Sequence, residues 1–92
     1  MLLKTLTAGA VSGTDTLTVK GFIIGGVLIT TDGTNAASVT IRRNDASGKI
    51  LFQISTKTPI FVSGPFSTEE TSTIYISVSG TGGAAQIYEW IT

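Results

Sequence analysis

The stretch Thr73-Ile74-Tyr75-Ile76-Ser77-Val78-Ser79 decides the fold class, because it alternates strictly between apolar and hydroxyl-bearing residues. In an extended strand successive side chains point to opposite faces, so the three aliphatic residues would share one face. A sheet with one face on a core and the other face in water produces this pattern. The segment therefore predicts a β-strand that is covered on one side.

The same two-residue period recurs along the chain, and the 3.6-residue period of an amphipathic helix is absent. Three more segments alternate in this way: Thr16–Val19, Val39–Arg42 and Lys49–Ser55. Two others, Phe22–Ile29 and Gln86–Ile91, are apolar on both faces. Gly25 and Gly26 interrupt the first of these, which predicts a strand with a bulge or bend at the glycines.

Turn-forming residues divide these strands at nearly regular spacing, which is typical of a β-sandwich. The expected breaks are Gly9–Asp15, Asp32–Asn35, Asn44–Gly48, Lys57–Pro59, Gly64–Thr71 and Gly80–Gly83. Pro59 and Pro65 cannot donate to a ladder, so Ile60–Val62 is expected to be an edge or sheet-switching strand. We therefore predict one all-β domain over residues 1–92. It is a jelly-roll-like antiparallel sandwich of seven to eight strands, with residues 1–7 as an N-terminal arm or an added strand.

The segment Asn44–Gly48 has the composition of a short hairpin loop. We expect Asn44 and Asp45 to cap their own backbone and Gly48 to adopt a positive φ.

The composition favours association with other proteins over catalysis. Charged residues are 13% of the chain, with six basic and six acidic side chains, so the surface carries few ions and no net charge. Cysteine and histidine are absent, which removes disulfides, the usual general base and the commonest metal ligand. A small domain without such supports can bury further surface by oligomerisation. We expect no cofactor and no enzymatic activity.

The charge balance and the lengths of the apolar runs also indicate which partners to expect. With no net charge, the chain has no field that would attract nucleic acid or an anionic membrane. Its longest apolar run, Phe22–Ile29, is far shorter than the ~20 residues that cross a bilayer, and Met1–Val11 does not resemble a signal peptide.

The acidic residues are interpreted mainly as turn residues. They are Asp15, Asp32, Asp45, Glu69, Glu70 and Glu89. The first five fall in predicted turns or loops, and paired catalytic carboxylates are the less favoured alternative. Glu89 lies inside an apolar strand, so we expect it to pair with Arg or Lys, in its own subunit or in the next.

Two loops contain residues that could bind a ligand. Asp32–Asn35 offers oxygen ligands for Ca²⁺, but it lacks the spacing of an EF-hand, and a polar strand connection is favoured. Gly48-Lys49 lacks the upstream glycine and the following Ser or Thr of a phosphate-binding loop.

The candidate interface residues are aromatic, aliphatic or basic. The candidates are Leu2, Leu3, Arg42, Arg43, Tyr88 and Trp90. Arg42 and Arg43 would point to opposite faces, either docking a partner or forming a solvated strand end. Tyr75, Tyr88 and Trp90 suit a core or a subunit interface, and a sugar-stacking platform is the alternative.

Several motifs together resemble a group of short proteins from tailed bacteriophages. The resemblance covers roughly residues 19–90 and is carried by Gly21–Thr30, Ala37–Arg42, Asn44–Gly48, Lys49–Phe52, Pro65-Phe66 and Ile74–Gly82. Members of that group look like small β-sandwich or jelly-roll virion proteins, and several sit on capsids as trimeric cement or decoration subunits.

The resemblance implies a structural virion protein made in the host cytoplasm and located on the capsid surface. It would form a homotrimer and bind the major capsid protein or another virion protein. Two alternatives remain: a tail, neck or fibre module of the phage, and a carbohydrate-binding β-sandwich module.

Overall fold

The structure is a computed structural model that describes residues 2–5, 10–19, 23–69 and 71–91. These residues form eight β-strands: β1 (Leu2–Thr5), β2 (Gly13–Thr18), β3 (Ile23–Thr30), β4 (Ala37–Arg43), β5 (Ile50–Thr56), β6 (Ile60–Ser67), β7 (Thr73–Ser79) and β8 (Ala84–Ile91). None of the described residues belongs to a helix that could cross a membrane.

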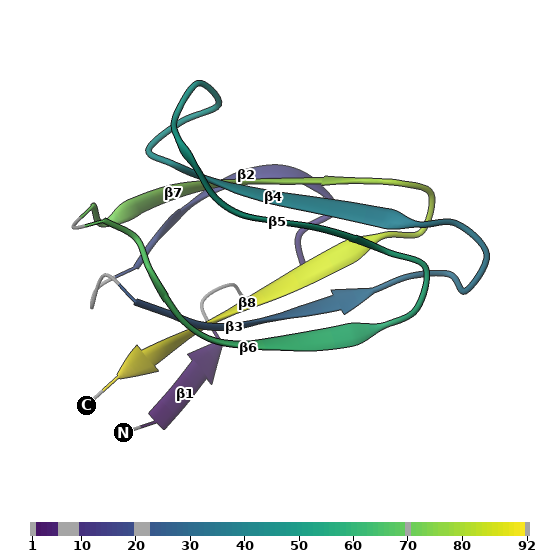
Figure 1. The fold of residues 1–92 in the computed structure, drawn as a ribbon, viewed down its shortest axis with the longest axis horizontal. Coiled ribbons are helices and arrows are strands. Elements are labelled where there is room, and N and C mark those ends of the chain that lie inside the picture. Colours follow the sequence, from purple (N-terminus) through teal and green to yellow (C-terminus); the bar gives the residue numbers. More distant parts are fainter. Residues whose placement is uncertain (1, 6–9, 20–22, 70, 92) are drawn as a thin grey trace.

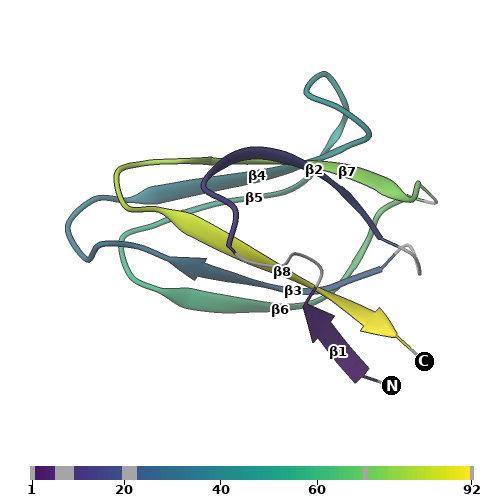
Figure 2. The same ribbon diagram turned by 180° about the vertical axis from the view of Figure 1, so that it is seen from behind.

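The strands form two stacked four-stranded sheets (Figures 1 and 2). Sheet A has the order β1-β8-β3-β6 and sheet B has the order β2-β7-β4-β5. Four antiparallel pairs, β1 with β8, β2 with β7, β3 with β6 and β4 with β5, describe one long hairpin whose tip is the β4–β5 turn. Additional pairing of β3 with β8 and of β4 with β7 rolls this hairpin up. This is the strand order of an eight-stranded jelly roll, so the predicted fold class is confirmed.

The core lies between the sheets and is aliphatic. In β7 the alternation works as predicted: Ile74 and Ile76 are fully buried and Val78 is 7% exposed, while the residues between them are half-buried on the outer side. The other buried apolar residues are Val11, Val19, Ile24, Val27, Ile29, Ala37, Val39, Ile41, Ala85 and Ile87.

The predicted bulge in β3 is confirmed, because the register with both neighbours shifts between Ile24 and Gly26. Gly64 of β6 lies against this bulge, and a Cβ at that position would overlap the carbonyl oxygen of Ile24. The expected break at Gly64–Thr71 was placed too early, since β6 continues to Ser67 through a cis Gly64–Pro65 peptide. As an edge strand, which the prediction for Ile60–Val62 allowed, β6 needs ladder bonds on one side only and tolerates the proline.

The expected break at Gly9–Asp15 was also too long. Strand β2 begins at Gly13, and Thr14 and Asp15 lie opposite Ser77 and Ile76 of β7. Asp15 is therefore a residue of an edge strand, whose exposed position accommodates a charged side chain.

The β4–β5 turn projects from one end of the sandwich (Figure 1), and its details correct the prediction. Asn44, not Gly48, has the positive φ, 66°. Glycine is still required at position 48, because a Cβ there would overlap the carbonyl oxygen of Arg43. Asp45 caps the backbone as expected, since its Oδ1 accepts from the amide of Ser47, but the side chain of Asn44 accepts instead from the hydroxyl of Thr71.

Within residues 1–7, Leu2–Thr5 form an added strand of the chain's own sheet. They pair antiparallel with β8, with Leu3 opposite Trp90 and Lys4 opposite Glu89. Residues 1, 6 and 7 lie outside the described part of the chain. The two labelled chain ends consequently lie at the same end of the sandwich (Figure 1).

Candidate interaction surface

The outer face of sheet A carries a group of apolar side chains from three neighbouring strands. Val27 and Ile29 face the core, so alternation turns Leu28 outward on β3, and the register sets Phe61 of β6 beside it. Tyr88 of β8 shares this side, because its neighbour Ile87 is fully buried. With Ile23, which is 38% exposed, these residues form what we call the apolar face: Ile23, Leu28, Phe61 and Tyr88.

Gly26 lies at the centre of the apolar face and leaves room there for an aromatic ring. It lies on β3 between β6 and β8, directly opposite Tyr88. A Cβ at this position would overlap the ring of Phe61, so the missing side chain leaves the space that this ring occupies. The rings of Phe61 and Tyr88 then meet edge to face, with centroids 5.8 Å apart, which is favourable aromatic geometry. Phe61 nevertheless remains 46% exposed.

No charged residue whose side chain is described lies on this outer face. Other outward positions carry Thr5, Thr30, Ser63, Pro65, Ser67, Ala84 and Gln86. The described charged side chains lie instead on sheet B, in the loops at the two ends of the sandwich, or, for Glu89, between the sheets. An exposed surface that combines large apolar groups with an absence of ions is typical of the core of a protein interface.

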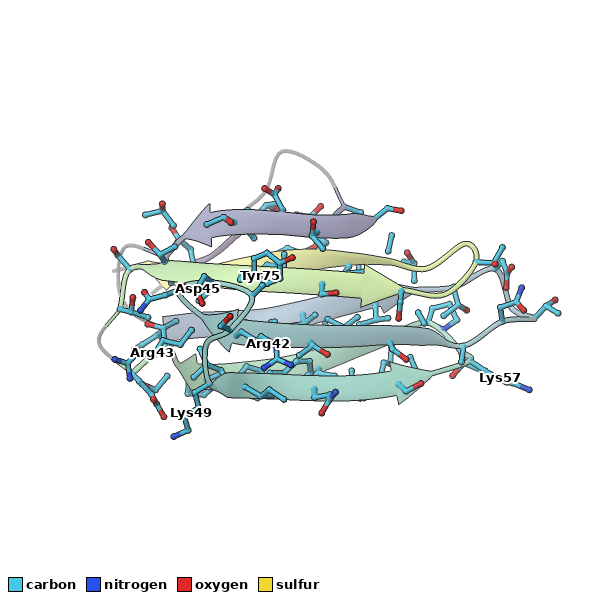
Figure 3. The ribbon with its side chains drawn as sticks, turned by 90° about the horizontal axis from the view of Figure 1, so that it is seen from above. Arg42, Arg43, Asp45, Lys49, Lys57 and Tyr75 are labelled. Atoms are coloured by element: carbon cyan, nitrogen blue, oxygen red, sulfur yellow. The ribbon has the colours of Figure 1, made fainter. Side chains whose placement is uncertain are left out.

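The outer face of sheet B is different, because hydroxyl groups dominate it. Figure 3 looks onto this face, with Tyr75 and Arg42 near its middle. These two residues lie directly opposite each other on β7 and β4, and Thr16 flanks Tyr75 on β2. The Arg42 guanidinium donates from Nη1 to the carbonyl of Gly48 at 3.0 Å, so its charge is used within the chain.

The predicted interface residues are only partly brought together. Tyr88 is half-buried on the apolar face. The side chains of Leu2, Leu3 and Trp90 lie outside the described part of the chain, although their backbones pair across β1 and β8. Tyr75 lies on the opposite outer face from Tyr88, so those two rings cannot form one stacking platform.

Arg43 points away from Arg42, as expected, and belongs to a charged cluster at the end of the sandwich. Glu69 accepts from Nζ of Lys49 at 2.6 Å and from Nη1 of Arg43 at 3.5 Å. The hydrogen bond from Lys49, assisted by Arg43, lowers the pKa of the Glu69 carboxyl. The side chains of Arg43 and Lys49 are exposed, so these pairs contribute little to stability.

The Asp32–Asn35 loop satisfies its own polar groups. Oδ1 of Asp32 accepts from the amides of Thr34 and Asn35, both at 2.8 Å, and Oδ2 accepts from Nδ2 of Asn35 at 2.9 Å. These hydrogen bonds, led by those from Asn35, lower the pKa of Asp32. The loop has the geometry of a polar strand connection. Among the described residues no three acidic side chains lie close enough to share a metal ion.

Glu89 is the one charged side chain among the described residues that the sandwich encloses. It is 4% exposed, lies opposite Ile24 on β3, and its Oε2 has no hydrogen-bond partner among the described residues. Backbone register sets Lys4 opposite it. The predicted pairing with a basic residue concerns a side chain outside the described part, and it stays a prediction.

The sequence alone did not single out Phe61, Leu28 and Ile23. Each lies in a run of consecutive apolar residues, where periodicity does not tell the inner face from the outer one. One pattern pointed to the site, namely a glycine inside an apolar strand, which marks a place where another group approaches closely. Here the approaching group is the Phe61 ring above Gly26.

The described residues form no pocket. No protein-family model, curated protein or solved structure matches the chain.

Proposed function

We propose that this chain is a structural subunit of a larger assembly and that it binds a partner protein through the apolar face of sheet A. The observation that carries this proposal is the aromatic pair of the exposed Phe61 and the half-buried Tyr88, which lies on a sheet face without described charges. Such a face costs free energy while it is in water and gains free energy when another protein covers it.

The free energy gained by covering the apolar face is large enough for binding when several of its residues contribute. Phe61 is 46% exposed, which for a side chain of roughly 200 Å² leaves about 90 Å² in water. Covering that area at about 25 cal/mol per Å² contributes about 2 kcal/mol, or about thirtyfold in affinity. Leu28, Ile23 and Tyr88 add to this around the same centre.

The assembly that we propose is the virion of a tailed bacteriophage, with the chain as a cement or decoration protein on the capsid. This part rests on the resemblance of the strand and turn motifs to small virion proteins, and jelly rolls are common among capsid components. On a lattice of many identical sites, modest contacts of each subunit combine, and multivalency slows its loss. A tail, neck or fibre module would use the same face at far fewer copies per particle.

A carbohydrate-binding role has less support. Flat glycan platforms use aromatic rings that lie side by side, and Tyr75 and Tyr88 lie on opposite faces of the sandwich.

Binding to empty phage shells tests the proposal. The purified chain, Phe61→Asp and Thr40→Asp are each titrated onto empty shells of the phage that encodes the chain and collected by sedimentation. Both variants add one carboxylate to an outer sheet face, but Thr40 lies on the hydroxyl-rich face of sheet B. We expect saturable binding of the wild type, at least thirtyfold weaker binding of Phe61→Asp, and Thr40→Asp within threefold of the wild type.

Absence of wild-type binding would reject the capsid role. Equal loss in the two variants would show that the apolar face is not the contact. Circular dichroism of each variant checks that the fold is retained.

A further inference from the structure

Strand β5 forms an edge of sheet B that lacks the usual protection against pairing with another strand. It lies at the end of the order β2-β7-β4-β5, and β4 pairs with one side of it. Among the described residues no strand pairs with its other side. The backbone amides and carbonyls on that side have no strand partner within the described residues and are open to water or to another extended chain.

The other three edge strands each carry a feature that discourages pairing. Strand β6 contains Gly64–Pro65, β2 contains Gly13 and the exposed Asp15, and β1 has four residues. Strand β5 reads Ile-Leu-Phe-Gln-Ile-Ser-Thr, with no charge, proline or glycine, and its one irregularity, at Leu51, lies near its start. Edge strands usually carry charges or proline to prevent edge-to-edge contact, and short uncharged segments of this composition pair readily.

We propose that β5 pairs antiparallel with β5 of a second copy of this chain, so that two B sheets form one continuous eight-stranded sheet. Identical strands related by a two-fold axis pair in this manner, because each contributes the same row of donors and acceptors. The inference goes beyond the proposed function, since it stands on the backbone of one edge strand and not on the apolar face.

The structure also selects the register. The β4–β5 pairing is irregular at Leu51 and regular over Phe52–Thr56, so the axis passes beside Ile54. Ile54 then faces its own copy and Gln53 faces Ser55 of the other copy. An axis beside Gln53 would instead bring Lys57 opposite Lys49 of the other copy, and like charges directly opposite each other are destabilising.

The same register also brings the half-buried apolar side chains of β5 in the two copies next to each other. Phe52 and Ile54 point toward the core but remain half-buried, because they lie at the rim of the sandwich, where Phe52 packs on Phe66 with ring centroids 5.1 Å apart. Pairing covers this rim from the side and leaves the apolar face of both copies free. The expected species is a dimer, which differs from the trimer that the resemblance to virion proteins implies.

Sedimentation velocity over a range of concentrations tests the proposal with the wild type, Gln53→Lys and Thr40→Lys. Gln53 and Thr40 lie opposite each other, and Nε2 of Gln53 donates to Oγ1 of Thr40 at 3.3 Å. Both variants lose this hydrogen bond and add one lysine to the same outer face, but only Gln53→Lys places the charge on the edge strand. We expect the wild type to form a dimer. The dimer dissociation constant should be at least tenfold higher for Gln53→Lys and should differ from the wild-type value by less than threefold for Thr40→Lys.

Hydrogen exchange on the wild type supplies a measurement that needs no variant. Amides within Phe52–Thr56 that face the open side should gain protection as the concentration rises, while those of β2 should not. A monomer at all concentrations, a trimer, or a dimer that both variants weaken equally would overturn the proposal. A monomer that still binds shells would overturn this inference alone, and a β5 dimer that does not bind shells would overturn only the proposed function.

Discussion

The outer faces of the two sheets have the same architecture but differ in composition. Each lies on a four-stranded antiparallel sheet whose inner side closes the same aliphatic core. Sheet A presents Phe61, Leu28, Tyr88 and Ile23, whereas sheet B presents mainly threonine and serine hydroxyls around Tyr75 and Arg42, with Ile50 as its one large exposed aliphatic residue among the described ones. Side chains at outer positions do not pack in the core, so their composition depends on whether the face contacts water or another molecule. Under the proposed function, the outer face of sheet A contacts a partner protein and the outer face of sheet B stays in water.

The largest expected effect concerns the way sheet A is built. Strand β3, an inner strand of this sheet, has a bulge between Ile24 and Gly26, and Gly64 of β6 lies so close that a Cβ would overlap the backbone oxygen of Ile24. Backbone atoms in a paired strand cannot move aside cheaply. We therefore expect Gly64→Ala to lower the free energy of unfolding by about 1–3 kcal/mol, as overpacking does.

Ser77→Ala is the matched change on sheet B, and urea denaturation measures both variants. Ser77 lies at a half-buried outer position on β7, and we expect its replacement to change stability by less than about 0.5 kcal/mol. If Gly64→Ala leaves the free energy of unfolding unchanged, the bulge of β3 does not require glycine at the neighbouring position of β6.

A smaller effect concerns salt. Association through a face without described charges should change less than twofold between 0.05 and 0.5 M sodium chloride, because there are no ion pairs to screen. Ammonium sulfate should strengthen it several-fold, since excluded salts favour the burial of apolar surface. Isothermal titration of the assembly partner measures both, and a steep loss with sodium chloride would assign the contact to the charged ends of the sandwich.

The smallest expected effect is on the stability of the fold at low pH. The folded chain holds the pKa of Glu69 below its ordinary value of 4.5 and that of Asp32 below 3.8. Their contribution to stability is therefore present above these ordinary values and is lost as the pH falls through the lower values of the folded state. We expect a slight fall of the melting temperature below about pH 4.5 that is reduced in Lys49→Met, with no change in association between pH 5 and 8. If the melting temperature of Lys49→Met falls with pH as much as that of the wild type, the Lys49–Glu69 ion pair does not contribute to acid stability.

The sequence predicted the features that depend on local pattern. Strict alternation located β7 at Thr73–Ser79, where the structure has it, and the paired glycines located the bulge of β3. The number of strands and the sandwich class followed from the spacing of turn residues.

The features that depend on pairing could not be predicted in this way. Phe61 lies between Ile60 and Val62, and only the register with β3 shows that Phe61 faces outward while both neighbours face the core. The open edge of β5 follows from the order of strands in sheet B, which no local pattern encodes. In the same way, Asp15 was expected in a turn, because its role as an edge residue exists only beside β7.

Hydroxyl-radical footprinting of the chain, free and in its assembled particle, tests the contrast between the two faces most directly. Aromatic side chains react readily, and Phe61, Tyr88 and Tyr75 report on the two outer faces of the sandwich. We expect oxidation of Phe61 and Tyr88 to fall several-fold on assembly while oxidation of Tyr75 stays unchanged. Protection of Tyr75 with Phe61 still reactive would contradict the assignment of sheet A as the contact face.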